Sequence, residues 1–79
     1  MKITLQLFGA FRPFGDALAL ELPANAVVSD IRAVLLKTVD AREDLVARSR
    51  FATETEVLAE HVSLKDGATI AIIPPVSGG

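Results

Sequence analysis

The chain has 79 residues and a formal net charge of −2, a size that fits one domain with one modest core. It has no cysteine, which excludes disulfides and thiol chemistry, and its Lys and Arg residues are scattered, which argues against nucleic-acid binding. No apolar run approaches the roughly 18 residues of a membrane span, and the first residues do not resemble a signal peptide. We therefore expect a cytoplasmic protein that binds neither nucleic acid nor membrane.

The N-terminal region predicts two strands that form a hairpin. Apolar and polar residues alternate from residue 2 to residue 8, the pattern of a half-buried strand. Phe8 falls on the polar side of this alternation, so its side chain is expected on the face opposite the core. Residues 9–16 contain two glycines and a proline and predict a loop. Residues 18–22 alternate again, and Pro23 ends this second strand.

The only long helical pattern follows. Apolar residues recur there at three- and four-residue spacing, at Val28, Ile31, Leu35 and Val39. Ser29 is expected to cap the start of the helix. Asp30 suits its first turn and Lys37 its last, because the helix dipole favours acidic groups at the N-terminus and basic groups at the C-terminus.

The remaining residues predict shorter elements. Residues 41–48 indicate a short second helix, or a turn, with Leu45 as its anchor. Residues 51–58 predict one strand or a short hairpin arm. The segment Leu64-Lys65-Asp66-Gly67 predicts a turn with an inward Leu64 and a positive φ at Gly67. Residues 68–73 are apolar on both sides, which is typical of a central strand.

Together these elements predict an α+β fold, a mixed sheet with one main helix across one face. Periodicity alone does not decide the topology of that sheet. We expect residues 1–75 to form the domain and residues 76–79 to form a flexible tail.

The tail carries the predicted chemistry. Pro74 and Pro75 fix φ and offer no backbone donor, so the last strand must end there and the chain leaves extended. Four further residues span about 13 Å when extended, enough to pass through a narrow channel into a partner. The two final glycines remove side-chain bulk near the reacting atoms. We therefore expect the Gly79 carboxylate to be an acyl donor that a partner activates, the alternative being an inert end.

The segment Pro74-Pro75-Val76-Ser77-Gly78-Gly79 resembles the C-terminal signature of the MoaD family, the small subunits of molybdopterin synthase. The Leu64–Gly67 turn is similar to the Leu-x-Asp-Gly turn of that family, and Leu7-Phe8-Gly9-Ala10-Phe11-Arg12 resembles the end of its first strand. Length and element order agree over essentially the whole chain. The resemblance implies a β-grasp, or ubiquitin-like, fold and a carrier that is not itself an enzyme.

The resemblance also implies a reaction sequence. A MoeB-like, E1-type enzyme using ATP and magnesium would adenylate Gly79, and a sulfur donor system would convert it to a thiocarboxylate. The tail would then enter a MoaE-like large subunit, within a heterotetramer, and give its sulfur to cyclic pyranopterin monophosphate. The chain itself would bind no cofactor and no metal.

The same resemblance implies the site residues. Gly78 and Gly79 would form the reactive end, and the residues that contact partners would be Phe8, Arg12, Val57, Ile73, Pro74, Pro75, Val76 and Ser77. Val57 and Ile73 also fit ordinary core packing, and Arg12 also fits a simple loop charge.

Two segments depart from the family pattern. Thr53-Glu54 stands where Val-Asn is common, and Ala68-Thr69 replaces two acidic residues near the tail. Fewer acidic groups beside the tail would weaken the electrostatic steering of this chain towards a basic partner surface. The identity of the partner is therefore left open. The alternatives are a ThiS-type carrier for thiamine thiazole synthesis, a ubiquitin-like modifier and a plain interaction domain.

Other polar residues indicate no further chemistry. His61 is the only histidine and is expected in a loop, with no nucleophile or metal-ligand cluster around it. Glu54 and Glu56 are expected on one face of a strand, as a solvated edge.

Overall fold

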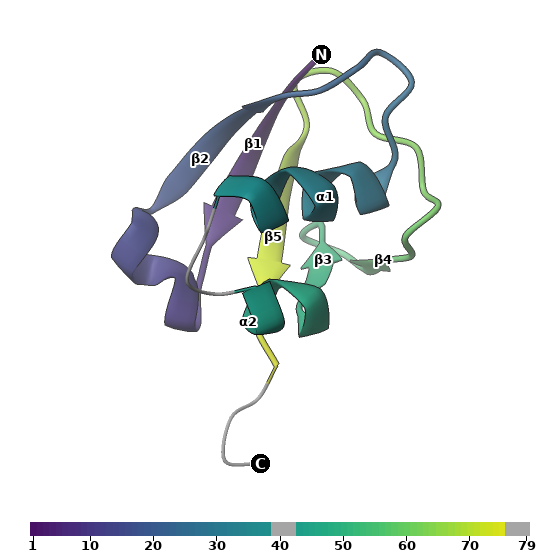
Figure 1. Cartoon of the computed structure of the whole chain (residues 1–79). Helices are drawn as coiled ribbons and strands as arrows, with labels where there is room; N and C mark the ends of the chain where they lie inside the picture. The colour runs from purple at the N-terminus through teal and green to yellow at the C-terminus, as the bar shows by residue number, and fades with distance from the viewer. Residues whose placement is uncertain (39–42, 76–79) are drawn as a thin grey trace.

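The computed structural model describes residues 1–38 and 43–75, and the elements in these two ranges form one mixed sheet with helices on one side (Figure 1). In chain order the elements are β1 (Lys2–Leu7), the 3-10 helix η1 (Gly9–Phe14), β2 (Ala17–Glu21), α1 (Val28–Thr38), α2 (Glu43–Arg48), β3 (Arg50–Ala52), β4 (Val57–Leu58) and β5 (Thr69–Ile73).

The strand order within the described residues is β2-β1-β5-β3-β4. β1 pairs parallel with β5 at the centre, and the β1–β2, β3–β5 and β3–β4 pairs are antiparallel. The predicted N-terminal hairpin and the predicted central position of the last strand are both confirmed. With α1 lying across the sheet, this is the predicted β-grasp arrangement (Figure 1).

One face of the sheet is buried against α1. The apolar stripe of the helix meets the inward residues of β1, β5 and β3, and the core includes Ile3, Leu5, Leu7, Val28, Ile31, Leu35, Phe51, Ile70 and Ile72. Complete burial of one such side chain contributes about 1.5–3 kcal/mol, so this layer supplies most of the driving force for folding. The other face, which we call the open face, carries the outward residues of the same strands.

The segment after β1 differs from the prediction. β1 ends at Leu7, and residues 9–14 form the 3-10 helix η1 instead of a loop. The reason is Phe11, whose side chain is buried in the core and which turns the chain inward. Phe8, directly before this helix, is exposed, as its place in the alternation predicted.

The predicted cap of α1 was wrong. The helix begins at Val28, so Ser29 lies inside its first turn. Instead, the Asp30 Oδ2 atom accepts a hydrogen bond of 2.8 Å from the Val27 N–H group. A carboxylate in this position both satisfies a free N–H group and complements the helix dipole. Lys37 lies in the last turn, as predicted, and Val39 lies outside the described residues.

The short helix α2 is confirmed from Glu43 onwards, with a different anchor. Val46 is fully buried, and Leu45 is only half-buried at the margin of the core. Since neighbouring helical residues point about 100° apart, only one of the two can face the core.

Residues 51–58, predicted as one strand or a single hairpin arm, instead contribute to both strands of a hairpin, β3 and β4. Phe51 pairs with Leu58 and Ala52 with Val57. The prediction that Glu54 and Glu56 share a strand was wrong, because Glu54 lies in the bend between β3 and β4 and Glu56 precedes β4.

The turn before β5 has the predicted geometry. Leu64 is buried and Gly67 has a φ of 84°, in the left-handed region that favours glycine. β5 begins at Thr69, one residue later than expected. Among the described residues, no helix has the length and apolar character needed to cross a membrane.

Candidate functional site

Three large apolar side chains are exposed on the open face. Phe8 is 45% exposed, Val57 58% and Ile73 43%. Val57 pairs with Ala52 on β3, and Ala52 pairs with Ala71 on β5. Val57, Ala52 and Ala71 therefore form one row across three strands, with their side chains on the outward side of the sheet. Ile73 is two residues beyond Ala71 and therefore points to the same side. These positions exclude core packing as the role of Val57 and Ile73.

The open face also holds a hollow beside this apolar group. Its lining includes Phe8, Ala71, Thr53, Glu54 and Thr69. The structure thus brings three of the four residues that depart from the family pattern to one place.

The chain leaves the sheet at Ile73, Pro74 and Pro75, which we call the tail root. Ile73 is the last residue of β5, and the two prolines are half-buried. Because β5 is central, the tail root lies between the ends of β1 and β3. The predicted site residues Val76, Ser77, Gly78 and Gly79 lie outside the described residues.

Gly9 packs directly against the tail root. A Cβ atom on Gly9 would lie 2.9 Å from Pro74 Cγ, closer than such atoms approach one another, and its φ is 55°. Both facts favour glycine at this position. Gly9 therefore lets the first proline of the tail root lie against the turn that follows β1.

Two arginines lie on the other side of the tail root. Arg50 pairs with Ile73 in the β3–β5 ladder, and Arg48 ends α2 two residues earlier. Both line a hollow with Ile73, Pro74 and Pro75. The exit of the tail is thus apolar on one side and basic on another.

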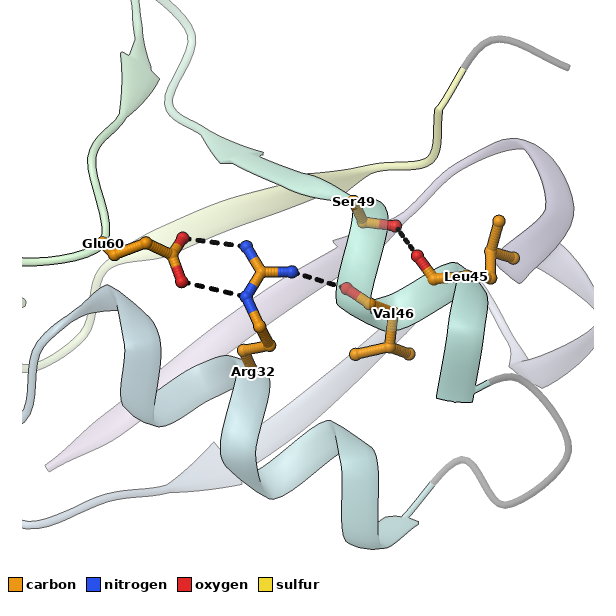
Figure 2. Close-up of polar contacts among 5 residues, drawn as sticks. All are labelled: Arg32, Leu45, Val46, Ser49 and Glu60. Carbon is orange, nitrogen blue, oxygen red and sulfur yellow. Dashed lines mark hydrogen bonds and ion pairs between the residues drawn. The ribbon is translucent and has the colours of Figure 1, made fainter.

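A third arginine ties the elements around this region together (Figure 2). Arg32 on α1 donates from Nε and Nη2 to the two carboxylate oxygens of Glu60, at 2.9 and 2.8 Å. Its Nη1 atom donates to the Val46 carbonyl oxygen at 2.5 Å, and its guanidinium carbon lies 5.0 Å from the centre of the Phe51 ring. The hydrogen bonds from Arg32 lower the pKa of Glu60, against the smaller opposing effect of burial.

The junction between α2 and β3 is fixed by a second polar contact, also shown in Figure 2. Ser49 is the one buried polar residue among those described, and its Oγ atom donates to the Leu45 carbonyl oxygen at 2.6 Å. Together with Arg32, this bond holds the backbone that carries Arg48 and Arg50.

The other polar residues are placed as follows. Arg12 Nη2 lies 3.0 Å from Asp16 Oδ1, and both side chains are largely exposed. Such an exposed pair contributes little stability, so its presence does not exclude a partner contact by Arg12. His61 is exposed. Within residues 1–38 and 43–75, no group of three or more His, Cys, Asp or Glu side chains is arranged to hold a metal ion.

Sequence reasoning missed Gly9, Arg48, Arg50 and the Arg32–Glu60 pair. The closeness of Arg48 and Arg50 in the sequence was a weak signal, because Arg48 ends a helix and Arg50 begins a strand, so spacing alone does not place them on one side. Nothing local in the sequence indicated that Gly9 meets Pro74.

The fold and the tail root define a ubiquitin-like β-grasp protein whose central strand leads into a Pro-Pro segment and a Gly-Gly end. The ThiS family model matches residues 5–79, and the chain belongs to the ThiS family. The fold is that of ThiS- and MoaD-like sulfur carriers and of ubiquitin-like modifiers.

Solved structures with this fold include SAMP1 of Haloferax volcanii, with a TM-score of 0.84, 21% identity and complete coverage of both chains. A putative molybdopterin converting factor subunit 1 of Pyrococcus furiosus has a TM-score of 0.79 and 24% identity, over 95% of this chain and 98% of that chain. A complex of subunits 1 and 2 of the molybdopterin-converting factor of Helicobacter pylori matches with a TM-score of 0.71 and 21% identity, with complete coverage of both chains. No curated protein matches this chain.

Proposed function

We propose that this chain is the sulfur carrier subunit of molybdenum cofactor biosynthesis, with the Gly79 carboxylate as the sulfur-carrying group. The observation that carries the proposal is the tail root, where a central strand leads into Pro74 and Pro75 at an exit bordered by exposed apolar residues. The family match extends from residue 5 to Gly79 and so includes this segment. In this proposal, residues 1–75 are the docking body and residues 76–79 enter the partner.

The proposed chemistry occurs on the tail but is catalysed elsewhere. A Gly79 carboxylate oxygen attacks the α-phosphorus of ATP in a MoeB-like enzyme, with magnesium there, and pyrophosphate leaves. Sulfide-level sulfur from a donor system then forms a bond to the Gly79 carbonyl carbon, the bond from that carbon to the AMP oxygen breaks, and AMP leaves. The sulfur of the resulting thiocarboxylate replaces an oxygen substituent on a carbon of cyclic pyranopterin monophosphate in a MoaE-like large subunit. Water then attacks the Gly79 carbonyl carbon, the bond from that carbon to sulfur breaks, and the carboxylate is restored. We propose that the cycle takes place in the cytoplasm.

The open face supplies the proposed docking surface for both partners. Phe8, Val57 and Ile73 form an exposed apolar group next to the tail root, and such a group on a small domain marks an interaction surface. The Helicobacter pylori structure is a complex between subunits 1 and 2 of its molybdopterin-converting factor. By analogy we propose that two carriers flank a MoaE-like dimer in a heterotetramer, with Arg12 and the residues from Pro74 to Ser77 in contact with the large subunit.

A second function is favoured by one specific observation. SAMP1 of Haloferax volcanii, which matches over its whole length, is a small archaeal modifier protein. In that function Gly79 would form an isopeptide bond to a lysine of a target protein. A ThiS-type carrier for thiazole synthesis would use the same thiocarboxylate with a different acceptor.

Intact-mass measurement separates these functions. The chain is incubated with the adenylating enzyme of its own organism, ATP, magnesium and a sulfur source. We expect a mass gain equal to the replacement of one oxygen by sulfur. Deletion of Gly79 should abolish it, and the control variant His61→Ala, at an exposed residue with no assigned role, should retain it.

The outcomes distinguish the candidates. No mass gain with a competent enzyme would contradict the carrier function. Higher-mass conjugates that depend on Gly79 would favour the modifier. If the charged carrier forms molybdopterin with a MoaE-like subunit and the pterin precursor, the pathway is that of the molybdenum cofactor.

A further inference from the structure

Arg48 and Arg50 differ from the other arginines that the structure describes. Arg12 pairs with Asp16, and Arg32 pairs with Glu60. Within residues 1–38 and 43–75, neither Arg48 nor Arg50 forms an ion pair. Asp44 lies one helical turn before Arg48, yet no ion pair joins the two.

The backbone that carries these two side chains is fixed. Ser49 lies between them, is buried, and is bound through its hydroxyl to the Leu45 carbonyl oxygen. Arg48 and Arg50 are both exposed. The two guanidinium groups are thus presented to solvent from a rigid base, which lowers the entropy lost when they bind a ligand.

Their position relative to the tail is the second observation. Arg48 and Arg50 line the hollow beside the tail root, together with Ile73, Pro74 and Pro75. They also line a neighbouring hollow that extends towards Arg32 and Glu60. The two hollows therefore share this pair of cations, next to the point where the tail leaves the sheet.

We propose that Arg48 and Arg50 form a docking site for carboxylate groups on the partner that activates the tail. The proposal rests on the proposed function, and the partner surface in question is an acidic rim around the tail channel of the adenylating enzyme. A guanidinium group binds a carboxylate through two parallel hydrogen bonds, a geometry that an ammonium group does not offer. In a chain with a net charge of −2, a local basic pair orients the tail root towards an acidic surface before the tail enters.

The reach of the tail favours a protein carboxylate over the phosphate of the acyl-adenylate. Four extended residues span about 13 Å, which places the acyl group of Gly79 beyond the reach of an arginine side chain at the tail root. The groups within reach are those of the rim that surrounds the tail root.

The test compares two charge reversals of equal size. Arg48→Glu/Arg50→Glu alters the tail root, and Lys2→Glu/Lys65→Glu alters exposed lysines at the opposite end of the sheet. Each is made in the chain lacking Gly79, so that binding is measured without chemistry. The Kd for the adenylating enzyme is measured by titration calorimetry at low and high salt, and thermal unfolding of each variant is recorded.

We expect the Arg48/Arg50 reversal to weaken binding about tenfold or more at low salt, and the Lys2/Lys65 reversal to leave it within about twofold. Affinity of the unreversed chain should fall more steeply with salt than that of the Arg48/Arg50 variant. Arg48→Lys/Arg50→Lys should retain part of the affinity, because it keeps the charge and loses the bidentate geometry. Arg48→Gln/Arg50→Gln should weaken binding less than the reversal.

The proposal is overturned if the Arg48/Arg50 reversal binds like the unreversed chain while full-length chain gains sulfur at Gly79. In that case the carrier function stands and only the docking site fails. If full-length chain neither binds the enzyme nor gains sulfur, the carrier function itself fails. If Arg48→Glu/Arg50→Glu lowers the unfolding temperature, binding by Arg48→Gln/Arg50→Gln is used in its place. Weaker binding by that variant at an unchanged unfolding temperature shows a docking effect.

Discussion

The two ends of the sheet differ in how many of their polar groups are bonded within the domain. At the end where β1 begins, the Met1 ammonium group donates to the Leu22 carbonyl oxygen at 2.6 Å and lies 3.4 Å from Glu21. The Lys2 N–H group donates to Asp66 Oδ1 at 2.7 Å, and the Gly67 N–H group donates to the Lys2 carbonyl oxygen at 2.7 Å. At this end, which we call the closed end, the terminal ammonium group and these backbone groups are bonded within the domain.

The end from which the tail leaves has the opposite character. Phe8 and Ile73 are exposed there, and Arg48 and Arg50 stand without ion pairs in the described part of the chain. Large apolar side chains exposed together on one face of a small domain are typical of an interaction surface. The difference between the ends separates the part of the sheet that maintains the fold from the part proposed to bind.

The largest expected effect comes from two neighbouring isoleucines on β5. Ile72 is fully buried under α1, and Ile73 points to the open face. Ile72→Ala should lower the free energy of unfolding by about 2–5 kcal/mol, because it leaves a cavity in the core. Ile73→Ala should lower it by less than about 1 kcal/mol and yet weaken partner binding.

Urea unfolding and calorimetric binding measure both quantities. If Ile72→Ala does not fold, Ile72→Val serves instead, with an expected loss of about 0.5–1.5 kcal/mol. Equal stability losses at positions 72 and 73 would contradict the division between a structural face and a binding face.

A smaller effect is expected from two glycines, one at each end. Gly9 and Gly67 both have positive φ, so alanine at either position should cost about 1–2 kcal/mol from backbone strain. No atom lies within 4 Å of a Cβ built on Gly67, whereas one on Gly9 meets Pro74 at 2.9 Å. We therefore expect Gly9→Ala, but not Gly67→Ala, to slow sulfur loading of Gly79.

Single-turnover loading followed by intact mass, at matched fractions of folded protein, measures this difference. If both variants load at the same rate, the contact between Gly9 and Pro74 has no role in directing the tail.

The smallest effect concerns the paired arginine near the tail end. Arg32 holds the pKa of Glu60 below its ordinary value of 4.5 in the folded chain. The pair therefore contributes stability above about that pH, and the contribution is lost as the pH falls through the lower folded-state pKa. Glu60 is half exposed, so we expect less than about 1 kcal/mol.

Thermal unfolding between neutral and acidic pH tests this expectation. Glu60→Gln should remove part of the loss of stability at acidic pH. Glu56→Gln, at an exposed carboxylate with no ion pair among the described residues, is the matched control. An unchanged acid dependence in Glu60→Gln would show that the Arg32 pair does not stabilise the fold.

The sequence by itself determined the features that depend on local geometry. Alternation along β1 placed Phe8 opposite the core, and the apolar stripe of α1 identified the helix that covers the sheet. The two-sided apolar character of β5 predicted its central position, and the tail motif indicated the family. These patterns are visible because side chains alternate in a strand and recur every 3.6 residues in a helix.

Only the tertiary structure decided what meets at the tail root. Gly9 and Pro74 come from opposite ends of the chain, and Arg50 reaches Ile73 through the pairing of β3 with β5. The choice of Val46 over Leu45 as the anchor of α2 likewise depended on where that helix settles against the core. Strand register and helix docking set these contacts, and both are fixed by packing over the whole domain, which no local pattern encodes.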